Sequence, residues 1–322
     1  MNFKLLKDLY GIHSKSGSEV CIIRYICNWV RNNIPEATIK CDTYNGNIYI
    51  TKGISESYPC MVAHLDQVQT YHPKDFVAIE TRDLIIGYST NDRKQAGLGA
   101  DDKNGIWMSL ICLQKHQVMK CAFFSQEEVG CRGASKADMD FFKDVRFVIE
   151  ADRRGNSDMV TEIAFSDLCS QEFIKTVDSG KYGYKKTSGL MTDILELKEQ
   201  GLAVSCINIS CGYYEPHTDH EFTNKRDLIK SFSFADHIIS ECTNVYPHVL
   251  EWEGYYGKLE YTYYDMDYYD ELYEIISSQL MEDPTLEPMD IYELYKNEYP
   301  GISADIIAEI YDDAKYAIKL LN

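Results

Sequence analysis

Histidines and carboxylates recur in short clusters along the amino-terminal part of the chain, each beside an apolar run or a glycine. The clusters contain His64 with Asp66, Asp101, Glu127 with Glu128, Asp152 and His217. Imidazole and carboxylate together are ligands suited to Zn²⁺ and, less selectively, to Mn²⁺ or Co²⁺. One carboxylate can bridge two cations, and a metal pair both activates water and stabilises an oxyanion. The chemistry that these residue types favour is therefore metal-assisted hydrolysis.

Each cluster taken alone is weak evidence for a site. A lone histidine at the end of a strand is usually a hydrogen-bonded structural or surface residue. Paired acids such as Glu127 and Glu128 are most often a solvated face. Five clusters that each follow an apolar strand are harder to explain by packing, because packing gives no reason to place them at the edge of a sheet. The series as a whole therefore predicts a functional site.

The elements that must position these residues alternate between strands and helices. Apolar and alternating runs predict strands at 38–41, 47–50, 59–63, 76–79, 84–86, 120–125, 146–150 and, after an alternation through Ile194, 203–209. Helical spacing predicts helices at 2–10, from the capping segment 14–19 to about 32, and at 105–114, 133–142 and 223–241. This order favours an α/β three-layer sandwich with a mixed, mostly parallel central sheet. Ligands of such sheets bind at the carboxyl ends of the strands.

The last part of the chain differs in composition. The whole chain of 322 residues carries a formal net charge of -19, from 51 acids and 32 bases. Residues 249–322 hold 18 of the acids and four of the bases, and the segment from Tyr246 holds 14 of the 25 tyrosines. Helical spacing and prolines predict helices at 267–281, at 288–299 and from Ser303 onward. We therefore predict two parts, a catalytic domain at 1–248 and an acidic, Tyr-rich helical appendage at 249–322.

Seven motifs of the first part stand in an order that a known clan of enzymes shares. They are Ser14–Glu19, Asp42–Asn47, Ala63–Asp66, Gly99–Gly105, Gln126–Gly130, Ala151–Asp152 and His217–Glu221. In kind, order and approximate spacing they resemble the co-catalytic di-zinc exopeptidases, which include peptidase T-like tripeptidases, glutamyl aminopeptidase-like enzymes and acylase-type amidohydrolases. The resemblance covers about residues 1–245.

The resemblance implies two Zn²⁺ ions per chain, with Mn²⁺ or Co²⁺ as alternatives. It implies that His64 and Asp152 bind one ion and that Glu128 and His217 bind the other. Asp101 would bridge both ions. An aspartate at position 152, where relatives can have glutamate, leans within such families toward peptidases that act on free amino termini.

Two further residues have implied roles in catalysis. Asp66 would hydrogen-bond the far nitrogen of His64 and fix its tautomer. Glu127 would be the general base, which takes a proton from the attacking water and passes it to the leaving amine.

Neighbours of these residues offer alternatives. His220 is the rival of His217 as a ligand, although the spacing from His217 to Glu221 follows the pattern of the clan. Arg153 and Arg154 follow Asp152 directly and are equally well read as a grip for a substrate carboxylate or as ordinary exposed charges. Cys131 lacks a visible partner base, so it reads as a packing residue.

The chain departs from its relatives in the inserts that it lacks. The tripeptidase-like and acylase-like branches insert a lid or dimerisation domain between the positions of Asp152 and His217, where this chain has 64 residues. The glutamyl aminopeptidase-like branch inserts a domain between the positions of His64 and Asp101, where this chain has 36. We therefore expect a bare catalytic domain. The appendage then reads as a cover over the cleft, as an oligomerisation or partner surface, or as a helical cap on the core.

We expect a cytoplasmic di-metal hydrolase that cleaves a peptide bond of small peptides, and specifically an aminopeptidase. The alternatives are an N-acyl amino-acid amidohydrolase and a catalytically silent binding relative. The amino terminus resembles neither a signal peptide nor a membrane anchor. The eleven cysteines show no C-x-x-C pair and read as reduced thiols. The acidic charge disfavours nucleic acid as a partner, and a homo-oligomer is compatible with the sequence.

Overall fold

The computed structural model describes residues 3–163, 166–190 and 192–250, then 272–296 apart from 274 and 282, and seven residues between 304 and 315. The chain divides into two compact units, residues 1–253 and 254–322. The first unit holds all the residues of the clusters described above.

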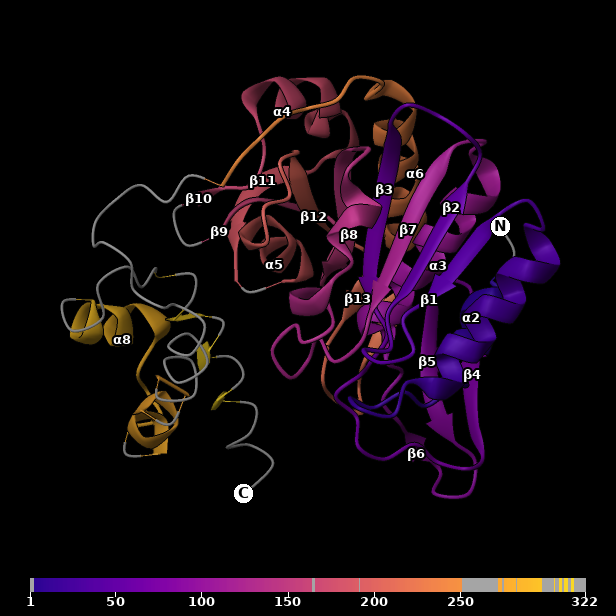
Figure 1. The fold of residues 1–322 in the computed structure, drawn as a ribbon. Coiled ribbons are helices and arrows are strands. Elements are labelled where there is room, and N and C mark those ends of the chain that lie inside the picture. Colours follow the sequence, from indigo (N-terminus) through magenta and orange to yellow (C-terminus); the bar gives the residue numbers. More distant parts are fainter. Residues whose placement is uncertain are drawn as a thin grey trace. The chain divides into compact units, whose positions relative to one another are not determined.

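A mixed sheet forms the centre of the first unit (Figure 1). Its strands, in spatial order, are β1 (Thr38–Cys41), β2 (Ile48–Lys52), β7 (Met119–Phe124), β3 (Tyr58–His64), β8 (Val145–Arg153), β12 (Cys206–Ser210), β9 (Asp158–Ile163) and β10 (Ser166–Asp167), with β11 (Lys185–Gly189) paired to β9. The four central strands, β7, β3, β8 and β12, run parallel, and antiparallel pairs flank them. Parallel strands are covered on both faces, and all residues of β3 and β7 are buried.

Helices cover both faces of this sheet, which confirms the predicted three-layer sandwich. On one face, Met61 and Ala63 belong to a core shared with α1 (Lys4–Tyr10), α2 (Val20–Asn33), α3 (Ala100–Lys115), α4 (Gln171–Val177) and α6 (Lys225–Glu241). On the other, Cys60 and Val62 belong to a core shared with α5 (Asp193–Glu199). The alternation along β3 follows from the two-residue period of a strand. None of the helices in the described residues has the length and apolar character that a membrane span requires.

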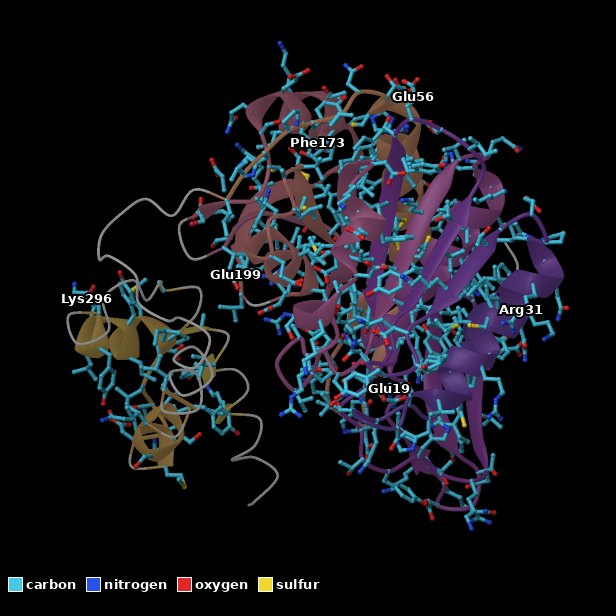
Figure 2. All side chains as sticks on the ribbon, in the orientation of Figure 1. Glu19, Arg31, Glu56, Phe173, Glu199 and Lys296 are labelled. Carbon is cyan, nitrogen blue, oxygen red and sulfur yellow. The ribbon has the colours of Figure 1, made fainter. Side chains whose placement is uncertain are left out.

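Aromatic side chains fill the first of these cores. Phe173 of α4, labelled in Figure 2, packs with its ring centroid 5.3 Å from that of Phe147 on β8 and 5.0 Å from that of Tyr246. Trp107 of α3 is fully buried and lies 5.8 Å from the ring of Phe3. The first of these contacts holds α4 against β8, and the second joins α3 to the start of α1.

A second, smaller sheet lies beside the first and was not expected as a separate sheet. It consists of β13 (Tyr213–Tyr214), β14 (Phe222–Asn224), β5 (Leu84–Ser89) and β4 (Phe76–Glu80), with β6 (Lys94–Gln95) paired to β5. All of its pairs are antiparallel. The sheet brings residues near 90 and near 220 together, although they are far apart in the sequence.

Two local predictions are wrong. The helix predicted at 133–142 is two short 3₁₀ turns, Ala134–Lys136 and Met139–Phe142. Between them Asp138 is extended, and its backbone N–H donates to the hydroxyl of Tyr49. Ile194, predicted to lie in an alternating segment, belongs to helix α5, and the following strand begins only at Cys206. Leu195 and Leu197 of this helix are two residues apart, a spacing that a strand also shows.

The C-terminal unit is helical where it is described. Residues 275–281 are helical, and α8 (Pro288–Tyr295) begins with a capping box between Glu287 and Asp290. An apolar cluster joins its helices: Leu272, Ile276, Leu280, Ile291, Ile307 and Ile310. The start of the helix predicted at 267–281, the end of that at 288–299 and Ser303 lie outside the described residues. The described part of this unit thus has an apolar core of its own.

The burial of each isoleucine predicts how much it contributes to the stability of the fold. Ile149 of β8 is fully buried and Ile54 is 98% exposed. We expect Ile149→Ala to lower the free energy of unfolding by about 2–5 kcal/mol, because it removes buried methyl groups and leaves a cavity. Ile54→Ala, the matched control, should change it by less than about 0.5 kcal/mol. Urea denaturation measures both, and equal effects would contradict the burial of Ile149.

Candidate metal centre

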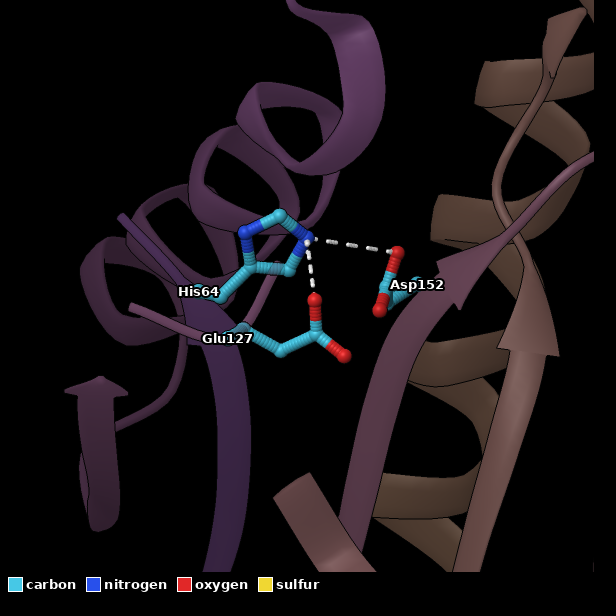
Figure 3. A group of neighbouring side chains, drawn as sticks. All are labelled: His64, Glu127 and Asp152. Atoms are coloured by element: carbon cyan, nitrogen blue, oxygen red, sulfur yellow. Dashed lines mark ion pairs between the residues drawn. The ribbon is translucent and has the colours of Figure 1, made fainter. Parts of the chain in front are cut away.

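Three neighbouring strands of the central sheet bring histidine and carboxylates to one edge. His64 is the last residue of β3, the turn after β7 carries Glu127 and Glu128, and Asp152 lies near the end of β8. The Nε2 atom of His64 lies 3.7 Å from Oδ1 of Asp152 and 3.8 Å from Oε2 of Glu127. Figure 3 shows both carboxylates turned toward this nitrogen. The carboxyl ends of parallel strands thus meet as expected.

The remaining two predicted ligands come from elsewhere, so the expectation that every cluster ends an apolar strand is wrong for them. Asp101 lies in the first turn of α3, after the smaller sheet's β6, and His217 lies in the loop between β13 and β14. Oδ1 of Asp101 is 2.9 Å from Nε2 of His64, and its Oδ2 is 3.4 Å from Nε2 of His217. The Nε2 atom of His217 is also 3.3 Å from Glu128. Asp101 therefore lies between the two imidazoles.

The backbone that presents these side chains enters the left-handed region at several positions. Gly99 has φ 63°, Gln126 has φ 56° and His217 has φ 64°. Residues other than glycine rarely adopt such values, which are held by surrounding structure and gather at functional sites. The backbone N–H of Gln126 lies 3.3 Å from Oε1 of Glu19, a buried side chain at the start of α2 (labelled in Figure 2). The turn before Glu127 is thus held from α2.

Asp66 joins the end of β3 to the turn that follows β7. Its carboxylate accepts hydrogen bonds from the backbone N–H groups of Glu127, at 2.9 Å, and Glu128, at 3.3 Å. It also accepts from the hydroxyl of Ser16 at 2.6 Å. Its Oδ1 lies 3.5 Å from Nδ1 of His64, which is longer than an ordinary hydrogen bond. This position suits Asp66 to orient His64. Its carboxylate also holds the backbone of Glu127 and Glu128.

Glu221 performs a similar task for Asp101, which the sequence did not indicate. It is fully buried and accepts hydrogen bonds from the backbone N–H groups of Gly99, at 2.5 Å, and Asp101, at 3.1 Å. Burial raises the pKa of Glu221 to about 7, although these hydrogen bonds oppose the rise. Glu221 precedes β14, so this carboxylate ties the smaller sheet to the start of α3.

Two further buried carboxylates lie on the α5 side of the sheet and were missed. Glu150 precedes Asp152 by two residues on β8, so both point to the same face, and it accepts a hydrogen bond from the hydroxyl of Thr192. Asp193 opens α5, and neither of its oxygens has a hydrogen-bond partner among the described residues. In the sequence, Glu150 interrupts an apolar run, and such a break can indicate a functional residue. Asp193 has no comparable signal. Burial, together with neighbouring carboxylates, raises the pKa of both well above the usual value, so both are held as neutral carboxyl groups behind the predicted ligands.

The electrostatics of the cluster call for cations. Burial raises the pKa values of Glu127, Glu128 and Asp152, and repulsion from neighbouring carboxylates adds to the effect. Burial alone would lower the pKa of His217, but contacts with Asp101 and Glu128 raise it to about 12. Without metal ions, such a cluster lowers its negative charge by protonating its own imidazoles and carboxylates. Divalent ions would neutralise it with all ligands in their binding forms.

The donor set fits metal ions. Two groups have ligand atoms within 4.8 Å of one another, His64 with Glu127 and Asp152, and His64 with Asp101 and Glu128. Oε1 of Glu128 is buried and lacks a hydrogen-bond partner among the described residues. A buried carboxylate oxygen without a donor is costly in a protein interior, and a bound cation would satisfy it.

His220, Arg153 and Cys131, the alternatives that the sequence offered, lie close to these residues in the chain. His220 is exposed, and its backbone N–H donates to the hydroxyl of Thr218. Arg153 pairs with Asp158, with Nε 3.3 Å from Oδ2. Cys131 is buried, with Sγ 3.6 Å from Oε1 of Glu127. Burial raises the pKa of Cys131 well above its usual value, so the thiol stays protonated and does not suit nucleophilic catalysis.

Solved structures share this fold, whereas no protein-family model and no curated protein match the chain. The aminopeptidase PepT from Bacillus cereus superposes with a TM-score of 0.57 at 14% identity, over 75% of this chain and 99% of that one. A tripeptidase from Staphylococcus aureus gives 0.59 at 15% identity, over 74% and 96%. The Pyrococcus horikoshii TET1 peptidase, which can assemble into a tetrahedron or a large octahedral shell, gives 0.52 at 14% identity, over 74% and 98%. The predicted resemblance to exopeptidases of the peptidase T kind is thereby confirmed at the level of the fold.

The donor set predicts metal binding that depends on one of two nearby histidines. Zinc added to chelator-treated protein at 100 times its Kd should stabilise the fold by about 2.7 kcal/mol per site. We expect His217→Ala to lower the affinity for one of the two ions by at least about 100-fold, because loss of an outer-shell partner alone lowers affinity 10–100-fold. His220→Ala is the matched control and should bind like the parent. Calorimetric titration measures both; the reverse pattern would show that His220 is the ligand.

Proposed function

We propose that the chain is a two-metal peptidase that removes residues from the free amino terminus of small peptides. The observation that carries the proposal is the position of Asp101, with one carboxylate oxygen toward His64 and the other toward His217. A carboxylate so placed suits a bridge between two cations. The fold shared with an aminopeptidase and a tripeptidase supports the same reaction.

The proposal assigns the ligands as the family resemblance implies. His64 and Asp152 hold one ion, Glu128 and His217 hold the other, and Asp101 holds both. We take the ions to be two Zn²⁺, with Mn²⁺ or Co²⁺ as alternatives, since imidazole and carboxylate suit all three. When bound, such a pair lowers the pKa of water and polarises the carbonyl of the scissile bond.

Glu127 is the general base in this proposal. Its Oε2 lies 3.8 Å from Nε2 of His64 and belongs with His64 and Asp152 to one group of possible ligand atoms, so the proposal places it beside a bound ion. Burial raises its pKa well above the usual value, which suits a carboxylate that must accept a proton and hold it briefly. Glu127 takes a proton from the attacking water and delivers it to the nitrogen of the leaving amine. The hydrogen bond from its backbone N–H to Asp66 keeps the side chain aimed at the site.

A free amino terminus is the substrate end that the acidic groups around the site would bind. Glu150 and Asp193 place two buried carboxyl groups behind Asp152. Burial raises their pKa values well above the usual value, and an ammonium group close to them would favour their ionised form. The aspartate at position 152 leans the same way by resemblance. An acylated amino terminus would bring no positive charge to these groups.

The remaining assignments follow from the same proposal. Residues 1–248 form the catalytic domain, and residues 249–322 form a separate helical appendage. The assembly of the TET1 peptidase makes a homo-oligomer the state to test first. All eleven cysteines are free, which supports a cytoplasmic location because that compartment keeps thiols reduced.

Removal of the base separates catalysis from metal binding. Glu127→Gln should lower kcat for a dipeptide by about 10²–10⁴-fold, the range that general-base catalysis contributes, with the zinc content unchanged. Glu56→Gln is the control, since Glu56 is exposed and precedes the opposite, amino end of β3. Metal analysis and steady-state kinetics on the same samples test this. A variant that loses zinc would show that Glu127 is a ligand and that base and ligand are exchanged.

A substrate panel tests whether the enzyme requires a free amino terminus. With zinc bound, we expect turnover of aminoacyl-anilides and of di- and tripeptides, and none of N-acetyl amino acids, because the latter lack the ammonium group. Cleavage of only the N-acetyl compounds would establish the amidohydrolase instead. No turnover of either class, with zinc or manganese present, would establish a silent binding relative.

A further inference from the structure

A pair of thiols lies between the first long helix and the edge of the central sheet. Cys27 is on α2 and Cys41 is the last residue of β1, and their Sγ atoms are 3.3 Å apart. Cys27 is 4% exposed, whereas Cys41 is exposed. A disulfide has its sulfur atoms about 2.05 Å apart, so a shift of little more than 1 Å would bring these atoms to bonding distance.

Both elements that carry the thiols also support the turn with Glu127. At the start of α2, Glu19 accepts a hydrogen bond from the backbone N–H of Gln126. After β1, the carbonyl of Asn45 accepts from the hydroxyl of Ser125 at 2.5 Å, and the side chain of Asn47 accepts from the backbone N–H of Ser125 at 3.3 Å. A covalent link between α2 and β1 therefore joins two supports of one turn.

We propose that Cys27 and Cys41 form a site of reversible disulfide formation with low-molecular-weight disulfides such as oxidised glutathione. The proposal stands on the sulfur–sulfur contact and on the exposure of one of the two thiols. It does not rest on the peptidase activity or on bound metal.

The chemistry proceeds in two thiol–disulfide exchanges. The Cys41 thiolate attacks one sulfur of oxidised glutathione, so that a mixed disulfide forms and one glutathione leaves as thiolate and takes up the proton that Cys41 lost. Cys27 then attacks the Sγ of Cys41, the mixed bond breaks, and the second glutathione leaves with the proton from Cys27. Both cysteines are oxidised, and one glutathione disulfide is reduced to two thiols.

The environments of the two thiols set the order of these steps. Burial, together with the contact to Cys41, raises the pKa of Cys27 to about 12. Thiolate is the attacking species, and Cys27 is buried, so Cys41 reacts first with a reagent from solution. Once Cys41 carries the mixed disulfide, the short distance to Cys27 favours internal attack.

Cys21 supplies a matched control on the same helix. It is exposed like Cys41, and it lies in the first turn of α2, two turns before Cys27. It therefore meets the same reagent, and the two cysteines differ in that Cys41 has the thiol of Cys27 in contact with it. Oxidised glutathione should leave Cys21 as a mixed disulfide or as a free thiol.

The closed loop would stabilise the fold by restricting the unfolded chain. The link encloses residues 27–41, a loop of the length for which chain entropy gives a substantial effect. Oxidation should therefore raise the melting temperature by several degrees. The effect should disappear on reduction and in Cys27→Ser, in which Cys41 is left with a mixed disulfide.

The experiment uses the full chain, the variants Cys27→Ser, Cys41→Ser and Cys21→Ser, and oxidised glutathione followed by alkylation. Trypsin cuts after Arg24, Arg31 and Lys40 and so separates the two cysteines. We expect a linked pair of peptides, 25–31 with 41–52, in the parent and in Cys21→Ser. Neither Cys27→Ser nor Cys41→Ser should yield it, and Cys27→Ser should keep a glutathione adduct on Cys41.

The outcomes that overturn the proposal are equally specific. A stable glutathione adduct on Cys41 of the parent, without the linked peptides, would show that Cys27 does not reach it. Linked peptides that include Cys21 would show exchange without selectivity. An unchanged melting temperature in a fully linked sample would show that the bond does not constrain the fold.

Discussion

The structure depends on the contact between Asp101 and two imidazoles that come from different sheets. His64 ends a central strand, whereas His217 lies in a hairpin of the smaller sheet, and Asp101 has one oxygen toward each. This contact requires both sheets and the start of α3 to be held in one arrangement. Asp66 and Glu221 accept backbone hydrogen bonds from the segments that carry the proposed ligands. The site therefore depends on these positioning carboxylates as well as on the proposed ligands.

Burial of so many acids explains why the site calls for cations. Carboxylates removed from water are costly unless they are paired or bind a metal. Here Glu128 has a buried oxygen without a donor, and Asp193 has two, among the described residues. A fold that keeps these groups buried is stable only with protons or cations among them. The net charge of the chain is a poor guide to this feature, because the carboxylates of the site belong to the nearly balanced first part of the sequence.

The central strands and the long helices were predictable from the sequence, because long apolar runs and helical periods are local signals. The ligand clusters at His64, Glu127 and Asp152 were predictable for the same reason, since each follows such a strand. The smaller sheet was not, because β13 and β14 have two and three residues and pair with β5 far away in sequence. Glu221 acts through tertiary hydrogen bonds, and Asp193 is notable for its burial; neither feature has a local sequence pattern. At 134–142 the hydrogen bond from the backbone N–H of Asp138 to Tyr49 accompanies two short turns in place of the helix that the local sequence favours.

The most direct test of the metal pair is anomalous diffraction at the zinc edge from crystals grown with zinc. We predict two peaks, one beside His64 and Asp152 and the other beside Glu128 and His217, with the carboxylate of Asp101 between them and Glu127 bound to neither. A single peak, or a peak coordinated by Glu127 in place of Asp101, would contradict the two-metal site.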